Sequence, residues 1–209
     1  MIYDIHTHHE SAENAVFNLI LKNGQEILPQ QFCSVGIHPW YACDFNENMA
    51  QILRKYAEQP NVLAVGESGI DKLRGGDMDE QIKWLEYHIR LSEELGKPLI
   101  IHDVKGIDTI LALKKKYKPQ QAWVRHGFRG NEQMAKSLID NGFYISLGEK
   151  WNEKAVKFIP SERLLLETDE SLMSIEEIAE RIATVRGTDK KEILALSAEN
   201  IARIIPTIK

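Results

Sequence analysis

Two histidines lie two residues apart near the start of the chain, in the stretch Asp4-Ile5-His6-Thr7-His8. A β-strand directs residues i and i+2 to the same face of a sheet, so the His6 and His8 imidazoles would project side by side. Two neighbouring imidazoles can hold one metal ion. A pair that lies in the core or in solvent fits this short stretch equally well, so the interpretation depends on whether later segments supply further ligands.

Later apolar segments end in further side chains that can bind metal ions. These are His38, Glu67, His102, His126 and Asp169. In a parallel barrel all C-terminal strand ends meet at one face, so these residues would converge with the first pair. Six histidine and carboxylate ligands are enough for two divalent ions about 4 Å apart. The expected ligands are His6, His8, Glu67, His102, His126 and Asp169. Of the other histidines, His88 is expected to be structural and His9 to be solvated.

Eight short apolar segments must position these residues, and they span 2–8, 15–21, 32–38, 62–67, 98–102, 122–126, 143–147 and 164–169. From the third onward they alternate with helical patterns over 46–58, 78–95, 107–117, 131–141, 152–158, 174–186 and 190–204. This alternation predicts an α/β fold, a compact (β/α)8 TIM barrel. The connections 9–14 and 22–30 are too short for crossover helices, so the first two should be missing or reduced. Ser174 and Glu177 form a capping-box pattern.

Length and composition narrow the class of protein. The 209 residues, 43% of them apolar, suffice for a single domain over residues 1–209. The net charge of −5 gives no global basic field for nucleic acid, which leaves a local basic patch open. Cys33 and Cys43 are too few for a disulfide framework and are expected to be buried and reduced. There is no signal-peptide pattern and no membrane-length apolar run, so we expect a cytoplasmic protein without membrane contact or an obligate protein partner.

Six motifs in a fixed order resemble the TatD-related metal-dependent hydrolases, within the amidohydrolase-like barrel superfamily. The resemblance covers nearly the whole chain, and several motifs in order are more specific than any one alone. The motifs lie at residues 4–8 (DIHTH), 35–40 (VGIHPW), 64–71 (AVGESGID), 100–102 (IIH), 126–130 (HGFRG) and 165–169 (LLETD).

This resemblance implies a role for each residue at a strand end. His38 would contact substrate near the metals without binding them. Asp4 and Glu167, which share strand faces with ligands, could orient ligand side chains. The implied ligands are His6, His8 and Asp169 for one metal, His102 and His126 for the other, and Glu67 as the bridge between the two.

The chain also departs from the family pattern. Ser68 stands where an aliphatic residue is common, and Gly127 and Arg129 replace the more familiar Cys and Ser. Glu170 stands where Ala-Pro is usual, and the Arg-Asn-rich stretch that normally follows is absent. The chain therefore resembles a short subgroup, and its substrate cannot be copied from longer relatives.

The expected chemistry is hydrolysis by a metal-activated water. Two divalent ions, drawn from Zn, Mn, Mg, Ni or Co, would hold a bridging water or hydroxide between Glu67 and Asp169 and lower its pKa toward about 7. Asp169 is the expected general base, and His38 or a metal would stabilise the charge that develops on the substrate oxygen. The expected catalytic residues are thus Asp169, Glu67 and His38.

Two divalent ions would bring about four positive charges to the site, and two carboxylates and a hydroxide would remove about three. The remaining charge of about +1 favours an anionic substrate. Basic residues that follow strand ends could bind its phosphates, or could simply be solvated loop charges. Trp40 and Trp151 could stack on a base or only pack the loops. The expected substrate contacts are His38, Lys72, Arg74, Lys105, Arg129 and Lys150.

The leading hypothesis is a binuclear metal-dependent hydrolase of phosphodiester bonds, such as a deoxyribonuclease, with DNA or a small molecule as substrate. The phosphodiester part depends on the resemblance and the basic residues. One alternative is hydrolysis of amide, lactone or ester bonds at the same site, because the barrel does not decide between them. A second alternative is a metal-loaded binding protein without turnover.

Overall fold

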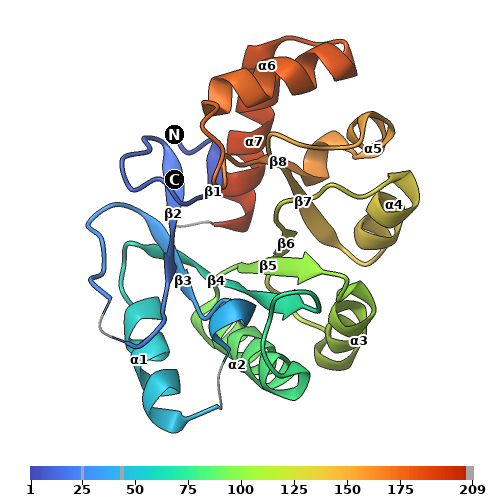
Figure 1. Cartoon of the computed structure of the whole chain (residues 1–209). Helices are drawn as coiled ribbons and strands as arrows, with labels where there is room; N and C mark the ends of the chain where they lie inside the picture. Colours follow the sequence, from blue (N-terminus) through green and yellow to red (C-terminus); the bar gives the residue numbers. More distant parts are fainter. Residues whose placement is uncertain (25, 43–44, 206–209) are drawn as a thin grey trace. The chain divides into compact units, whose positions relative to one another are not determined.

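The computed structural model describes residues 1–24, 26–42 and 45–205 (Figure 1). The eight parallel strands follow one another in chain order as a closed barrel, which confirms the predicted (β/α)8 fold class. The strands are β1 (Asp4–Thr7), β2 (Ala15–Ile20), β3 (Cys33–Gly36), β4 (Val62–Asp71), β5 (Leu99–Val104), β6 (Trp123–Arg125), β7 (Phe143–Leu147) and β8 (Leu164–Leu166).

Seven α-helices lie where the sequence predicts them, with ends within one residue of the predicted ones. They are α1 (Glu47–Ala57), α2 (Met78–Leu95), α3 (Ile107–Tyr117), α4 (Glu132–Asp140), α5 (Glu153–Phe158), α6 (Ile175–Arg186) and α7 (Lys190–Ile204). Two short 3-10 helices, Pro39–Tyr41 and Ser161–Arg163, were not predicted. The described residues between β1 and β2, and between β2 and β3, contain no helix, as expected. In the described ranges, no helix is long and apolar enough to cross a membrane.

The chain divides into two compact units. The first unit takes in Met1–Phe17 and the chain from Val124 onward, and the second is the continuous segment Asn18–Trp123. Cys33, in the second unit, is buried as predicted. Cys43 lies outside the described residues.

In the first unit, β7 and β8 pair in parallel, and β8 also pairs with β1. Helices α6 and α7, drawn in orange to red in Figure 1, lie against each other and against β8. The predicted capping box begins α6, because the Ser174 side chain accepts from the Glu177 backbone N–H while Glu177 accepts from that of Ser174. The Ser197 hydroxyl of α7 accepts from Leu166 N at 3.0 Å and donates to Tyr3 O at 2.8 Å. One buried side chain thereby ties α7 to both β8 and the start of β1.

In the second unit, β3, β4 and β5 are parallel neighbours. All ten residues of β4 are buried, as in a strand covered on both faces. Helix α2 contacts β4 and buries Trp84, Leu85, His88 and Ile89 on one face. Gly69 of β4 approaches β5 so closely that a Cβ there would lie 1.9 Å from the carbonyl oxygen of the facing β5 residue. Only glycine allows this spacing.

Two strands extend further than the sequence predicts. β4 continues to Asp71 and β5 to Val104, because these two residues are still paired in the parallel ladder. Glu67 and His102 therefore lie within their strands, and the prediction that they close them is wrong. The correction brings Asp71 into the same ladder as both residues.

Several other strands end earlier than predicted. β6 ends at Arg125 and β8 at Leu166, so His126 and Asp169 follow the strands instead of closing them. Asp169 has a φ of 55°, in the left-handed region, which a strand cannot contain. His8 and His38 likewise follow the ends of β1 and β3.

Candidate metal centre

Backbone hydrogen bonds connect β1 to the residue that carries the last predicted ligand. Asp169 N donates to His6 O at 3.0 Å, and His8 N donates to Asp169 O at 2.9 Å. The left-handed φ of Asp169 is one that aspartate tolerates better than most residues, and such conformations often occur at functional sites. The Nε2 atoms of His6 and His8 lie 3.8 and 3.5 Å from the Asp169 Oδ1 atom. The local backbone thus turns two imidazoles toward one carboxylate oxygen.

His126 completes this group, which we call the first-unit cluster (His6, His8, His126 and Asp169). The ring centroids of His6 and His126 are 4.3 Å apart. One ligand atom from each of His6, His126 and Asp169 lies within 4.8 Å of the other two. Ligand atoms around one ion with bonds of 2.0–2.2 Å are up to about 4 Å apart. The donor types and spacing therefore fit a divalent ion.

Asp4 lies behind this cluster and is fully buried. Its Oδ1 atom accepts from His6 N at 3.0 Å and from Thr168 N at 3.2 Å, and its Oδ2 accepts from Thr168 Oγ1 at 2.6 Å. Burial raises the pKa of the Asp4 carboxyl to about 7, although the Thr168 and His6 hydrogen bonds oppose that rise. Asp4 therefore holds the backbone of His6 and of Thr168, the residue before Asp169.

Glu167 is also buried and lies beside His126. Its Oε1 atom accepts from Gly127 N at 2.5 Å, and its Oε2 atom is 3.8 Å from His126 Nδ1. Burial opposes ionisation of this carboxyl, but the His126 and His6 imidazoles outweigh it and hold the pKa of Glu167 below its ordinary value. Glu167 is therefore placed to orient the His126 ring.

The second unit brings together His38, Glu67 and His102, which we call the second-unit cluster. The Glu67 Oε1 atom lies 2.7 Å from His102 Nδ1 and 3.3 Å from His38 Nε2, and these two nitrogens are 3.2 Å apart. One ligand atom from each of the three residues lies within 4.8 Å of the others. Two imidazoles and a carboxylate again suit a divalent ion.

Asn18 supports the Glu67 carboxylate in a way that the sequence did not reveal. Its Nδ2 atom donates to Glu67 Oε2 at 3.0 Å, and its Oδ1 atom accepts from Glu67 N at 3.1 Å. The Ser34 hydroxyl donates to the same Oδ1 atom at 3.2 Å. The only signal in the sequence is an asparagine within an apolar strand, where a buried amide needs partners.

Asp71 supports His102 from its other ring nitrogen. The Asp71 Oδ2 atom is 3.4 Å from His102 Nε2 and accepts from Trp40 Nε1 at 2.6 Å. Burial opposes ionisation of Asp71, but the Trp40 hydrogen bond and two backbone N–H groups outweigh it and lower its pKa. A carboxylate on the second nitrogen of a ligand histidine sets its tautomer and direction. Asp71 is the last residue of the motif at residues 64–71, but the sequence alone predicts no role for it.

His88 is structural, as predicted. Its Nδ1 atom lies 2.6 Å from Trp84 O, which can only accept, and its Nε2 atom accepts from Ile37 N at 3.0 Å. Both contacts require a neutral ring with the proton on Nδ1. Burial lowers the pKa of His88 to about 4. His88 thereby holds the backbone immediately before His38.

His9 differs from its prediction. Its side chain is half-buried and its Nε2 atom lies 2.7 Å from Ser171 O, so it is only partly solvated. The backbone bonds of Asp169 bring the loop that follows it, and with it Ser171, next to the end of β1.

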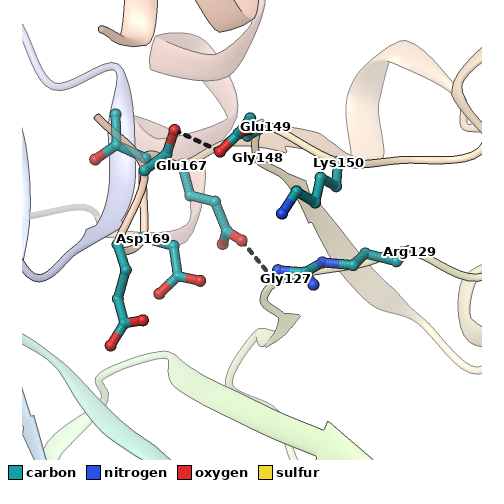
Figure 2. A pocket seen from close by; sticks show the side chains of 10 residues that line it. Gly127, Arg129, Gly148, Glu149, Lys150, Glu167 and Asp169 are labelled. Carbon is teal, nitrogen blue, oxygen red and sulfur yellow. Dashed lines mark hydrogen bonds between the residues drawn. The ribbon is translucent and has the colours of Figure 1, made fainter. Parts of the chain in front are cut away.

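The predicted basic residues fall in both units. In the second unit, Lys72 and Lys105 are exposed, and the Arg74 guanidinium lies 3.6 Å from the centroid of the Trp40 ring. In the first unit, Arg129 and Lys150 line a pocket together with Asp169 (Figure 2). The Trp151 ring packs beneath an arginine of α6. Both tryptophans therefore take part in loop packing.

The predicted ligands thus form one group in each unit. His126, which the resemblance pairs with His102, lies against His6, and His38, expected only to contact substrate, lies among ligand atoms. The bridging role of Glu67 and the pairing of His102 with His126 stay predictions.

Known proteins resemble the chain along most of its length. A curated relative from Buchnera aphidicola subsp. Baizongia pistaciae, named an uncharacterized metal-dependent hydrolase, is 37% identical over 175 residues, which are 78% of this chain and 64% of that protein. The matched part therefore spans less than two thirds of that relative. The 3'-5' ssDNA/RNA exonuclease TatD of Erwinia tasmaniensis is 27% identical over 199 residues, 82% of this chain and 76% of that protein.

A solved structure and a family model also resemble the chain, and both carry the TatD name. The crystal structure of YJJV, a TatD homologue from Escherichia coli K12, superposes with a TM-score of 0.83 at 18% identity over 98% of both chains, which supports the barrel fold. The family model described as TatD related DNase matches residues 7–206. Because that match spans nearly the whole sequence, the chain belongs to the TatD related DNase family.

Proposed function

We propose that the protein is a divalent-metal-dependent hydrolase that cleaves phosphodiester bonds in nucleic acid. The observation that supports this most is that each unit gathers a set of histidine and carboxylate donors suited to one divalent ion. Such ions supply a Lewis acid and a water nucleophile at neutral pH when they are bound. Two ions, one in each cluster, are our proposal, with Zn, Mn, Ni or Co favoured over Mg by the number of imidazoles.

Asp169 is the residue that we propose as the general base. Its Oδ1 atom faces the His6 and His8 imidazoles, and a carboxylate at this place is suited to accept a proton from an attacking water. Its side chain is 26% exposed and borders a pocket, so substrate can reach it. Glu67, at 2% exposure, is proposed as a metal ligand and as the bridge that the family resemblance implies.

His38 has two proposed roles. Its Nε2 atom lies within 3.3 Å of both Glu67 Oε1 and His102 Nδ1, which suits a metal ligand. The sequence instead predicts a contact with substrate. Metal content of a His38→Ala variant separates the two, because loss of a ligand lowers the metal content and loss of a substrate contact does not.

The choice of a phosphodiester substrate has two supports. A relative is named a 3'-5' ssDNA/RNA exonuclease. Basic side chains also follow several strand ends, where they could bind phosphate. A cytoplasmic location, a single domain and the absence of an obligate partner stay expectations from the sequence.

The test begins with elemental analysis of the protein as purified. The metal found is then supplied in assays with bis-nitrophenyl phosphate, single-stranded DNA, a lactone panel and a dipeptide panel. We expect turnover of the two phosphodiesters, and an Asp169→Asn variant should lower kcat by about a thousandfold. Asp108→Asn, an exposed residue of α3, is the matched control and should leave kcat unchanged.

Two outcomes would overturn the proposal. Turnover of lactones or dipeptides without any turnover of phosphodiesters would assign the site to carbonyl chemistry. Stoichiometric metal with rates that Asp169→Asn leaves unchanged would indicate a metal-loaded binding protein.

A further inference from the structure

The first unit contains a polar pocket at the ends of β6, β7 and β8 (Figure 2). The cavity has a volume of about 230 Å³, below the range of about 300–1,000 Å³ typical of pockets for whole organic ligands. It therefore suits one small group. The lining residues are Gly127, Arg129, Gly148, Glu149, Lys150, Glu167, Thr168, Asp169, Glu170 and Ser171.

Two cations project into this pocket without a protein partner. Arg129 follows β6 and Lys150 follows β7, and Figure 2 shows both charged ends extending toward the centre of the pocket. Within the described ranges, neither side chain makes a hydrogen bond or an ion pair. Both are exposed, so water solvates them now and a ligand could replace it.

The carboxylates in the same pocket do not neutralise these cations. Glu149 accepts from Ser171 Oγ at 2.9 Å, and Glu167 accepts from Gly127 N. Asp169 faces the histidines of the first-unit cluster. The remaining carboxylate, Glu170, is exposed. Three of the four acids are therefore directed to other groups, and the two cations remain available for an anion.

The chemistry of the lining identifies the anion. A guanidinium presents a planar fork that matches two oxygens of a phosphate, and an ammonium adds a compact charge. The lining contains no aromatic and no aliphatic side chain, so a nucleobase would find no ring to stack on. The lining therefore suits a small oxyanion such as a phosphate better than it suits a base.

We propose that this pocket binds a phosphate that is not cleaved, held between Arg129 and Lys150 beside Asp169. The inference rests on the proposed function and defines its substrate class further. The preferred substrates carry a second phosphate next to the scissile bond, as in a terminally phosphorylated oligonucleotide. Because the pocket contacts no base, the preference is independent of base sequence.

The test compares binding of thymidine monophosphate and of thymidine to the metal-loaded protein by calorimetry. Wild-type protein should bind the monophosphate at least a hundredfold more tightly than thymidine. Arg129→Gln or Lys150→Gln should weaken monophosphate binding about tenfold, and the double variant about a hundredfold, since each removes one charge-assisted contact. Arg129→Lys, which keeps the charge and loses the fork, should fall between wild type and Arg129→Gln.

The matched control is a Lys154→Gln, Lys191→Gln double variant, which removes the same charge from exposed positions of α5 and α7. Its affinity for the monophosphate should stay within twofold of wild type. Equal affinity in the pocket double variant and the wild type would overturn the inference, because the phosphate would then bind at the metals alone. If the pocket variant and the control variant lost the same affinity for the monophosphate, the effect would come from net charge alone. That result would also overturn the inference.

A second measurement separates this inference from the proposed function. Bis-nitrophenyl phosphate has one phosphate, so its turnover by wild-type protein tests phosphodiester hydrolysis alone. A thymidine dinucleotide with and without a terminal phosphate tests the pocket, and the phosphorylated form should have a KM at least tenfold lower. Turnover of the first compound with equal KM values for the two dinucleotides would remove the pocket inference and keep the function.

Discussion

The two donor clusters differ in how firmly the protein holds them. In the second-unit cluster, Glu67 is 2% exposed, lies 2.7 Å from a histidine nitrogen and is bonded to Asn18 on its other oxygen. In the first-unit cluster, the His8 and Asp169 side chains are 25% and 26% exposed and lie 3.5 Å apart. The second-unit cluster is therefore buried and closely hydrogen-bonded, whereas the first-unit cluster borders a pocket and has longer contacts. The second-unit cluster suits tight binding of an ion, and the first-unit cluster suits contact with substrate.

Metal removal should show this difference most strongly. An ion that binds only the folded state stabilises it by about 4 kcal/mol when its free concentration is a thousand times Kd. Titration with a chelator should lower the melting temperature in two steps, with the first-unit cluster emptied first. A double variant, His6→Ala with His8→Ala, should lose the early step and keep the late one. A melting curve that the chelator leaves unchanged would contradict both sites.

Removing one carboxylate from each cluster should sharpen the comparison in metal-free protein. Glu67→Ala removes the buried acceptor of Asn18 Nδ2 and the carboxylate that two imidazoles face, and we expect it to lower the free energy of unfolding by about 3 kcal/mol. Asp169→Ala should cost about 1 kcal/mol or less, because its histidine contacts are long and partly solvated. Urea unfolding of the two variants measures both values, and equal losses would show that the clusters are equally organised.

Acid should weaken the second unit through His88. An unfolded histidine takes up a proton below about pH 6.5, whereas burial holds the pKa of folded His88 at about 4. Its contribution to stability is therefore complete above pH 6.5 and is lost as the pH falls from 6.5 to 4, by up to about 3 kcal/mol. His88→Gln can still accept from Ile37 N and should flatten this part of the stability profile. Urea unfolding at several pH values in chelator checks it, and an unchanged slope in the variant would refute the assignment.

The smallest expected effect concerns Asp71. Asp71→Asn keeps the size of the side chain but removes the charge beside His102 Nε2, and we expect metal affinity of the second-unit cluster to fall by 10- to 100-fold. The affinity of the first-unit cluster should not change. Competition with a metal indicator measures both, with Asp108→Asn as the control. Equal weakening at both clusters would mean that Asp71 acts on the whole fold.

The helices were predictable because their signals are local, and so were the candidate ligands that the structure gathers into the two clusters. Capping residues such as Ser174 mark helix ends, and histidines after apolar runs mark strand ends. The grouping of ligands was less accessible, because the contact of His6 with His126 joins residues distant in sequence. The residues that hold the Glu67 and His102 side chains in place were not predicted, for the same reason. Asn18 and Asp71 have roles that only the pairing of strands reveals.

The Ser197 hydroxyl has a consequence for how the chain is made. It joins Tyr3 to a helix 194 positions later, so His6 and His8 belong to a unit whose helix α7 is made much later than they are. At about 5–20 residues per second, His6 and His8 wait roughly 10–40 s for that helix. The continuous segment of the second unit emerges in the meantime. A nascent chain that stops before α7 therefore carries these two candidate ligands without the helix that holds Tyr3, the residue before β1.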